Sequence, residues 1–313
     1  MSSRRVSIIT PSYNQGQFVE RTILSVLRQD YPNLQYIFVD ALSGDATAAI
    51  LDRYRSEIDI IIQERDEGQS DALNKGFARA DGEILAYINA DDCFASPNVV
   101  SQAVAELVQP RTGRELSNGA GQTADLIYGK RFYINEGGFF HNSYPFRPFN
   151  KEQLMQACYI PQECCFWTRE IFERAGNYVS KEHHFAMDYD LWLRMLAAGA
   201  KFVAVDEVFA LFRWYPGQKS NAEWETRGLP EIAALHQKYL GKVVAPAEMS
   251  RIFMEHYSGF NQATHPVQSE LFDALWADET RLKREVLGFA PLDHWMFKRE
   301  NVPGEREHAV NVR

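Results

Sequence analysis

The sequence has few cysteines, no long apolar run and no surplus of basic residues. Its four cysteines form no C-x-x-C pair, which excludes the usual zinc motifs and a disulfide framework, so we interpret them as buried thiols. No stretch reaches the roughly 18 apolar residues that cross a bilayer, and the first apolar run is too short for a signal peptide. We expect a cytoplasmic protein without a transmembrane segment, for which peripheral membrane association stays open.

The charge balance excludes another class of partner. The 313 residues carry a formal net charge of −9, and such a chain has no extended basic surface for a polyanion. Nucleic acid is therefore not expected as a partner. A small phosphate-bearing ligand is still compatible with this charge, because one bound metal ion offsets several phosphate charges.

Strand-like and helix-like patterns alternate along the first hundred residues. Short apolar runs predict strands, and apolar residues at helical spacing predict the helices between them. The predicted strands are 6–10, 35–39, 58–63 and 83–89, and the predicted helices are 18–27, 46–54 and 70–79. This alternation favours an α/β fold with a mainly parallel sheet flanked by helices. In such sheets ligands bind beyond the carboxyl ends of the strands.

The pattern changes in the second half of the chain. Strands are predicted at 126–133 and 164–167, a helix at 188–198 and a surface loop at 110–124. The aromatic-rich stretch 139–149 contains too many prolines and asparagines for a regular element. Beyond residue 220 we predict helices at 229–239, 247–257 and 269–286, which we interpret as a C-terminal helical appendage.

Acidic side chains follow two of the predicted strands. Asp91 and Asp92 come directly after the fourth strand. Adjacent carboxylates repel each other unless a cation or a ribose hydroxyl lies between them, and Mg²⁺ or Mn²⁺ suits such oxygen ligands. A solvated turn with a helix cap is the alternative. Asp40 ends the second strand, where it either accepts hydrogen bonds from a base or ribose or is a turn residue.

Other candidate contacts lie in the first loop and on the third helix. Tyr13 offers an aromatic face, and stacking on a base is worth about 1–3 kcal/mol, although a lone tyrosine there is equally well a surface residue. Asp71 and Asn74 are three residues apart and share one helix face. That face either contacts a nucleotide or is solvated.

Three segments, taken in order, resemble the successive motifs of family 2 glycosyltransferases. They are VSIITPSYN at 6–14, VDALSGD at 39–45 and NADD at 89–92. The resemblance implies the GT-A fold, a nucleotide-diphosphate sugar donor and transfer with inversion at the anomeric carbon. By position, Pro11, Tyr13 and Asp40 match residues that hold the base, Asp91 matches the residue near the ribose, and Asp92 matches the ligand of a divalent metal, Mn²⁺ or Mg²⁺.

The resemblance continues to residue 220, with two departures. Family members carry an acidic pair before the helix at 188–198, whose second carboxylate deprotonates the acceptor; Asp188 fits that place, and Met187 replaces the first acid. From the residues alone, Asp188 is equally well a helix cap. Many relatives have a histidine where Tyr215 stands, and tyrosine is a poor ligand for Mg²⁺. Metal binding then rests on Asp92, the diphosphate and water, with Lys219 or Arg213 neutralising phosphate.

The expected function is glycosyl transfer to a glycan or lipid-linked saccharide in polysaccharide or glycoconjugate synthesis, with UDP as the preferred nucleotide. Gln162, Trp192 and the stretch 139–149 are candidates for a platform under the acceptor sugar, although Trp192 is equally well a core residue. We assign donor binding to residues 1–100, acceptor binding and catalysis to 101–220 of the same domain, and a helical region to 221–313.

Two rival functions are weighed against this one. A dinucleotide oxidoreductase or a nucleotidyltransferase would carry a glycine-rich loop after the first strand, where this chain has PSYNQG at 11–16. A non-catalytic GT-A fold that binds a glycan or a partner protein stays open, because Met187 and Tyr215 depart from the family pattern and a fold does not determine function.

Overall fold

The computed structural model describes residues 3–109, 123–138, 140–143 and 146–254. Within these residues, nine strands form one sheet in the order β3-β2-β1-β4-β8-β6-β9-β5, and β7 pairs with β6. The strands are β1 (Val6–Ser12), β2 (Leu34–Asp40), β3 (Ile60–Gln63), β4 (Ile84–Tyr87), β5 (Cys93–Phe94), β6 (Leu126–Ile134), β7 (Phe140–Ser143), β8 (Cys165–Thr168) and β9 (Phe202–Arg213).

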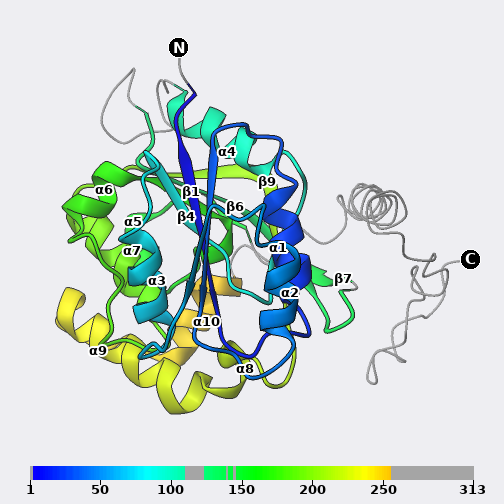
Figure 1. The fold of residues 1–313 in the computed structure, drawn as a ribbon. Helices are drawn as coiled ribbons and strands as arrows, with labels where there is room; N and C mark the ends of the chain where they lie inside the picture. The colour runs from blue at the N-terminus through cyan, green and yellow to red at the C-terminus, as the bar shows by residue number, and fades with distance from the viewer. Residues whose placement is uncertain (1–2, 110–122, 139, 144–145, 255–313) are drawn as a thin grey trace, which may run out of the picture. The chain divides into compact units, whose positions relative to one another are not determined.

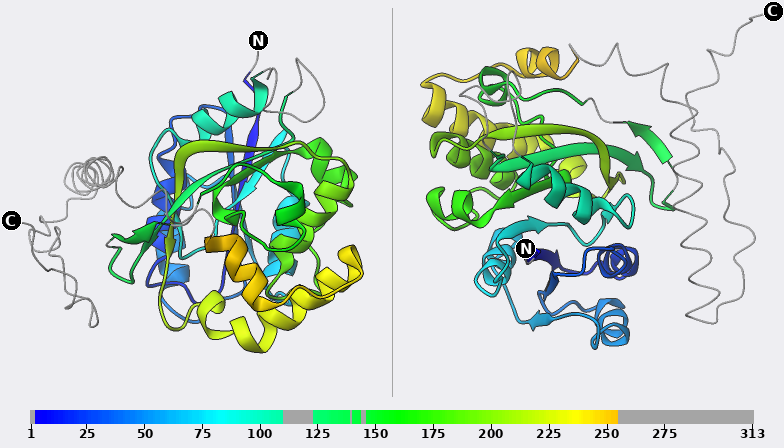
Figure 2. Two further views of the ribbon diagram at one scale, coloured as in Figure 1. Left: turned by 180° about the vertical axis from the view of Figure 1, so that it is seen from behind. Right: turned by 90° about the horizontal axis from the view of Figure 1, so that it is seen from above.

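The sheet has a parallel half and a mixed half. Strands β1 to β4 run parallel to one another, whereas β8 is antiparallel to both β4 and β6. The long strand β9 is parallel to β6 and pairs with β5 in the antiparallel sense. Figure 2 shows, in the view from above, the N-terminal elements in blue and cyan on one side and the green and yellow elements on the other.

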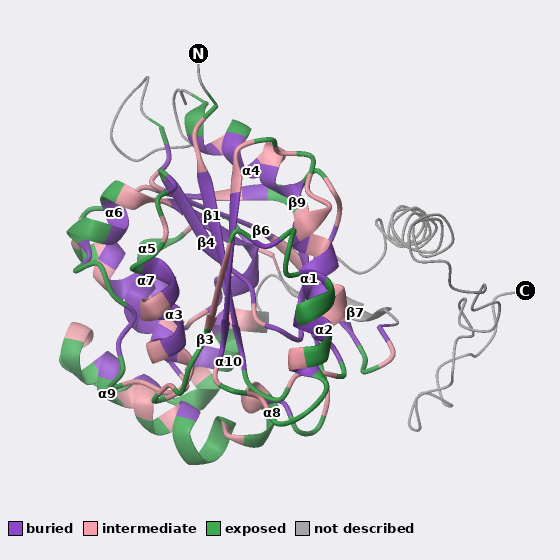
Figure 3. Ribbon diagram, in the orientation of Figure 1, coloured by how far each residue is buried: buried purple, intermediate pink, exposed green. Residues whose placement is uncertain are grey.

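Alternating side chains of the strands build two separate cores, one on each face of the sheet. One core packs against α1 (Val19–Leu27), α2 (Thr47–Arg53) and α4 (Val99–Val108). The other packs against α3 (Gln69–Phe77), α6 (Arg169–Arg174), α7 (Met187–Ala197), α9 (Leu229–Leu240) and α10 (Pro246–Met254). Figure 1 shows α1 and α2 on the opposite side of the sheet from α3 and α7, and Figure 3 shows the buried strands between helices with exposed outer faces.

Short helices connect these elements around the carboxyl ends of the strands. They are α5 (Lys151–Leu154), a 3₁₀ helix (Gln162–Cys164), α8 (Lys219–Ala222) and a π-helical turn (Trp224–Gly228). A single π-helical turn often marks a functional site. The last one leads directly into α9, so the C-terminal helices begin close to the strand ends.

The sequence predicted most of these elements. The predicted strands at 6–10 and 35–39 are β1 and β2, and the helix at 188–198 is α7. Helix α4 and strand β9 were missed. The expectation that 139–149 contains no regular element is wrong for residues 140–143, which form β7 because they pair with β6. The predictions for 110–122 and 269–286 lie outside the described residues, as do residues 139, 144–145 and 255–257. In the described ranges, none of the helices has the length and apolar character that a membrane crossing requires.

Helix α3 packs so closely on the sheet that a methyl group does not fit at Gly76. A Cβ there would lie 2.5 Å from Cγ2 of Ile9 and 3.3 Å from Cγ2 of Val39. We expect Gly76→Ala to lower the melting temperature, because overpacking costs about 1–3 kcal/mol and the gain in helix propensity is about 1 kcal/mol. Gly44→Ala, whose Cβ would have no neighbour closer than 4.0 Å, is the control in thermal denaturation. A Gly76→Ala protein as stable as wild type would contradict this packing.

Candidate active site

A cavity of about 1040 Å³ opens at the carboxyl ends of β1 and β4. Its wall combines the loop after β1, the residues that follow β4, the start of α3, the 3₁₀ helix, the start of α7 and the segment from β9 to the π-helical turn. This location agrees with the rule that ligands bind beyond the strand ends. The predicted site residues that line it are Pro11, Tyr13, Asp91, Gln162 and Asp188.

Arg213, at the end of β9, donates hydrogen bonds to both residues of the acidic pair. Its backbone N–H donates to Oδ1 of Asp92 at 2.9 Å, and its Nε donates to the backbone carbonyl of Asp91 at 2.9 Å. The hydroxyl of Tyr215 donates to Oδ2 of Asp91 at 3.0 Å. Tyr215, where relatives carry histidine, is therefore a hydrogen-bond donor to the acidic pair, which suits a neutral phenol.

Burial raises the pKa of both carboxyl groups. For Asp91 the hydroxyl of Tyr215 and the charge of Arg213 oppose the effect of burial on the pKa. For Asp92 the neighbouring carboxylates of Asp91 and Glu163 add to burial, and they raise its pKa well above the ordinary range. The pair therefore attracts either a proton or a cation.

The two carboxylates do not face the same way. Asp91 lines the cavity, whereas Asp92 is fully buried and is not part of the cavity wall. The carboxylate of Asp92 accepts hydrogen bonds from Arg213 and, at 3.4 Å, from the side-chain amide of Asn89. In this conformation Asp91, rather than the predicted Asp92, is placed to meet a metal ion.

The donor set fits a metal that takes most of its ligands from the substrate. Within the described residues, no cluster of three or more His, Cys, Asp or Glu side chains is arranged to hold a metal ion. Mg²⁺ commonly binds through one or two carboxylates together with substrate phosphates and water. The carboxylate of Asp91, facing the cavity, meets that requirement.

Asp188 occupies the first turn of α7 and lines the same cavity. Its Oδ1 accepts the backbone N–H of Tyr189 at 2.7 Å. Loss of hydration inside the cavity raises the pKa of Asp188, against the lowering effect of that hydrogen bond and of the nearby Lys219. A raised pKa makes the carboxylate a stronger base. Met187, which replaces an acid, is buried, and its sulfur accepts the hydroxyl of Ser70.

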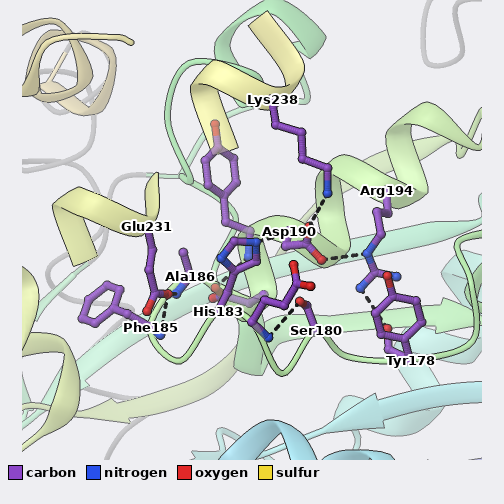
Figure 4. Close-up of polar contacts among 12 residues, drawn as sticks. Tyr178, Ser180, His183, Phe185, Ala186, Asp190, Arg194, Glu231 and Lys238 are labelled. Atoms are coloured by element: carbon purple, nitrogen blue, oxygen red, sulfur yellow. Dashed lines mark hydrogen bonds and ion pairs between the residues drawn. The ribbon is translucent and has the colours of Figure 1, made fainter. Parts of the chain in front are cut away.

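The loop before α7 is tied to α9 by a carboxylate that the sequence did not single out. Glu231 accepts the backbone N–H groups of three consecutive residues, His184 at 3.1 Å and Phe185 and Ala186 at 2.8 Å each (Figure 4). An acid in the first turn of a helix is also favoured by the helix dipole. Glu231 therefore determines where the segment that carries Asp188 begins.

A second carboxylate fixes the same loop from inside α7. Asp190 is buried and accepts Nε of Arg194 at 2.7 Å, while Nζ of Lys238 lies at 3.6 Å and the His183 ring at 3.9 Å (Figure 4). Arg194 in turn donates to the backbone carbonyl of Tyr178. Asp190 is thus a buried partner of cationic side chains and does not line the cavity, whereas Asp188 does.

The two predicted phosphate-neutralising cations have different positions. The Arg213 guanidinium is fully buried, donates to backbone carbonyls of Asp91 and of residues 135–136, and does not line the cavity. Lys219 does line it; its Nζ donates to Oε1 of Gln69 and to the carbonyl of His184. Burial lowers the pKa of Lys219, and nearby carboxylates, Asp188 first among them, oppose that shift.

Three predicted donor contacts lie outside the cavity wall. The carboxylate of Asp40 is buried and accepts the backbone N–H and hydroxyl of Ser43, so it shapes the loop after β2. Asn74 exchanges two hydrogen bonds with the backbone of Val179. Asp71 forms ion pairs with Lys75 and Lys181. These three side chains therefore bind other parts of the protein near the cavity and do not line it.

The two predicted acceptor contacts separate as well. Gln162 lines the cavity, and its amide donates to the carbonyl of Tyr87 at 2.7 Å. Trp192 is fully buried, packs edge-on against Trp167 and does not line the cavity. Of the two positions that the sequence left open for Trp192, the structure has the core one, because the helical spacing that marks α7 as amphipathic directs this side chain into the core.

The buried acidic pair has a cost that a substitution can reveal. Because burial raises the pKa of Asp92, its charged form is destabilised in the folded state, and the penalty grows as pH rises from the unfolded value of about 3.9 through the raised folded value. At neutral pH we expect Asp92→Asn to stabilise the protein by about 1 kcal/mol, or about 2–4 °C in Tm. The gain should shrink as pH falls toward 4. Asp190→Asn, which weakens a buried ion pair, should lower Tm. A lower Tm in Asp92→Asn as well would show that the Asp92 carboxylate stabilises the folded state, contrary to this prediction.

Comparison with known proteins agrees with this geometry. The model of the family Glycosyl transferase family 2 matches residues 7–175. Glycosyltransferase GlyG of Streptococcus pneumoniae is 30% identical over 258 residues, which cover 77% of this chain and 81% of GlyG. Four other curated relatives, 30% to 40% identical, are matched over only 33% to 41% of their own length.

Solved structures show the same fold at low sequence identity. Staphylococcus aureus TarS in complex with UDP-GlcNAc has a TM-score of 0.60 at 16% identity, covering 88% of this chain and 81% of that one. Mannosyltransferase PcManGT from Pyrobaculum calidifontis, in complex with GDP-Man and Mn²⁺, has a TM-score of 0.55 at 19% identity, covering 92% and 82%. The chain therefore belongs to glycosyltransferase family 2 and has the GT-A fold.

Proposed function

We propose that this protein transfers a sugar from a nucleotide-diphosphate sugar to an acceptor hydroxyl with inversion at the anomeric carbon, in the synthesis of a polysaccharide or glycoconjugate. The observation that carries the proposal is that one cavity is lined by Asp91, by an exposed aromatic ring, Tyr13, and by Asp188. Asp91 and Tyr13 suit the departing nucleotide, and Asp188 suits the incoming hydroxyl.

The donor half of the proposal rests on the loop after β1 and the end of β4. Tyr13 is 63% exposed in the cavity wall beside Pro11, so its ring is free to stack on a base. A divalent ion, Mn²⁺ or Mg²⁺, held by Asp91 would supply Lewis-acid stabilisation of the diphosphate. Lys219 adds a positive charge to the same cavity, and a cation with little hydration binds phosphate oxygens strongly. Relatives bound to UDP-GlcNAc and GDP-Man support a nucleotide sugar as donor.

The chemical step then needs one base and one displacement. Asp188 takes the proton of the acceptor hydroxyl while the acceptor oxygen attacks the anomeric carbon, and the bond to the diphosphate breaks with its electron pair on the phosphate oxygen. Attack from the face opposite the leaving group inverts the configuration. The raised pKa of Asp188 favours proton transfer to it, and Glu231 keeps its helix in place.

A nucleotide panel tests the donor site. UDP-, GDP- and dTDP-sugars, each with and without Mn²⁺, are added in a thermal-shift assay to wild type, Asp91→Asn and Asp71→Asn. We expect one nucleotide class to raise Tm in a Mn²⁺-dependent way, by the amount that ligand linkage predicts. Asp91→Asn should lose the Mn²⁺-dependent part, whereas Asp71→Asn, outside the cavity, should keep it. Absence of any shift would favour the rival, a non-catalytic fold that binds a glycan or partner protein.

Hydrolysis of the stabilising sugar nucleotide tests the base, with water as the acceptor. We expect Asp188→Asn to lower kcat by about 10²–10⁴-fold, the usual contribution of a positioned base, without loss of the nucleotide-induced thermal shift. In wild type, kcat should fall as pH decreases through the raised pKa of Asp188, because only the ionised form accepts a proton. Asp190→Asn, assayed at a temperature where it is folded, should retain that acid limb. Equal hydrolysis by wild type and Asp188→Asn would rule out this base.

A further inference from the structure

The tryptophans of the described ranges divide sharply by exposure. Trp167 and Trp192 are fully buried, whereas Trp214 is 38% and Trp224 is 39% exposed, and both exposed rings line the cavity. A large aromatic side chain left partly exposed in a concave wall is typical of a binding surface. Trp214 packs against Tyr133 and Phe212, at the end of β9. Trp224 lies elsewhere, in the π-helical turn that leads into α9.

Trp224 forms an aromatic pair with Phe185. Its ring centroid lies 5.8 Å from that of Phe185, with an angle of 60° between the ring planes. Both rings line the cavity, and Phe185 is three residues before Asp188 in the loop that opens α7. An apolar surface therefore lines the same cavity as the carboxylate of Asp188.

The pair is held in a defined position by its surroundings. The backbone N–H of Phe185 is bound by Glu231 at 2.8 Å (Figure 4). The Phe185 ring packs on Gly228, at the end of the same π-helical turn, where a Cβ would come within 2.9 Å of the ring. Only a residue without a side chain leaves room for this contact. Both rings are thus placed before any ligand binds, which lowers the entropic cost of binding.

Polar side chains stand beside the aromatic surface. Glu225 and Thr226 follow Trp224 in the turn, are exposed and line the cavity. An apolar ring face flanked by a carboxylate and a hydroxyl suits a ligand with one apolar face and a rim of hydroxyl groups. A pyranose ring has this character, because its axial C–H groups gather on a face and its hydroxyls project from the edge.

We propose that Phe185 and Trp224 form the platform on which a pyranose ring of the acceptor stacks, with Glu225 and Thr226 binding its hydroxyls. The proposal rests on the proposed glycosyl transfer and assigns the acceptor subsite to the loop before α7 and the turn before α9. The acceptor hydroxyl then meets Asp188 from the α9 side of the cavity, and the nucleotide enters from the β1 side. Residues of the C-terminal helical region thereby select the acceptor.

Saturation-transfer NMR tests the platform without knowledge of the natural acceptor. The probes are the methyl glycosides of glucose, galactose, mannose and N-acetylglucosamine at millimolar concentration, with mannitol as a control that has hydroxyls but no ring face. We expect at least one glycoside to receive saturation at its C–H protons from wild type, and mannitol to receive none. In Trp224→Ala the apparent affinity should fall about tenfold, as expected for loss of an aromatic contact, and Trp224→Phe should recover part of it.

Controls separate this proposal from the proposed function itself. Tyr178→Ala removes an aromatic ring that is 45% exposed but is not part of the cavity wall, and it should bind the glycosides as wild type does. The nucleotide-induced thermal shift should be the same in wild type and Trp224→Ala, which also shows that the variant is folded. Equal glycoside affinities of wild type and Trp224→Ala, or the absence of any glycoside signal with wild type, would overturn the platform and would not affect the proposed donor site. If no nucleotide sugar raised the Tm of wild type, the proposed function would be overturned instead.

Discussion

The site depends on the burial of two adjacent carboxylates at the end of β4. Burial raises the pKa of both carboxyl groups, and the charge of Asp91 raises the pKa of Asp92 further. The fold accommodates them because Arg213, at the end of β9, donates its backbone N–H to the Asp92 carboxylate and its Nε to the backbone carbonyl of Asp91. The end of β9, in the mixed half of the sheet, is thereby hydrogen-bonded to the residues that follow β4, in the parallel half, at the edge of the cavity.

This arrangement explains why the two aspartates have different positions although they are neighbours in sequence. Asp92 is directed into the protein, where donors of Arg213 and Asn89 satisfy it, and Asp91 is directed into the cavity. A structural carboxylate behind a ligand-facing one keeps the local potential negative, which favours binding of a cation there. The energetic cost is borne by the folded state, as is common where function and stability compete.

The C-terminal helices belong to the site as much as the sheet does. Glu231, at the start of α9, binds three backbone amides of the loop that opens α7, and Lys219 donates to the same loop. The residues of α9 and α10 also pack into the core that contains α7. A change of sequence in this region would therefore alter the part of the cavity wall formed by the loop before α7, while the part built on β1 and β4 stays the same.

The sequence by itself determined the alternation of strands and helices, the family, and the strand ends where Tyr13 and Asp91 lie, because these depend on local periodicity and short motifs. Through the family resemblance it assigned Asp91 to the ribose, Asp92 to the metal and Asp188 to the base. It did not show which of Asp91 and Asp92 faces the cavity, or that Trp192 is a core residue while Trp224 is exposed. Each of those pairs has the same chemistry, and side-chain direction at neighbouring positions is set by packing against residues that lie far away in the chain, such as Arg213 and Glu231. Only the tertiary structure showed strand β9 and the hydrogen bonds from the loop before α7 to Glu231, since long-range hydrogen bonds leave no periodic signal in the sequence.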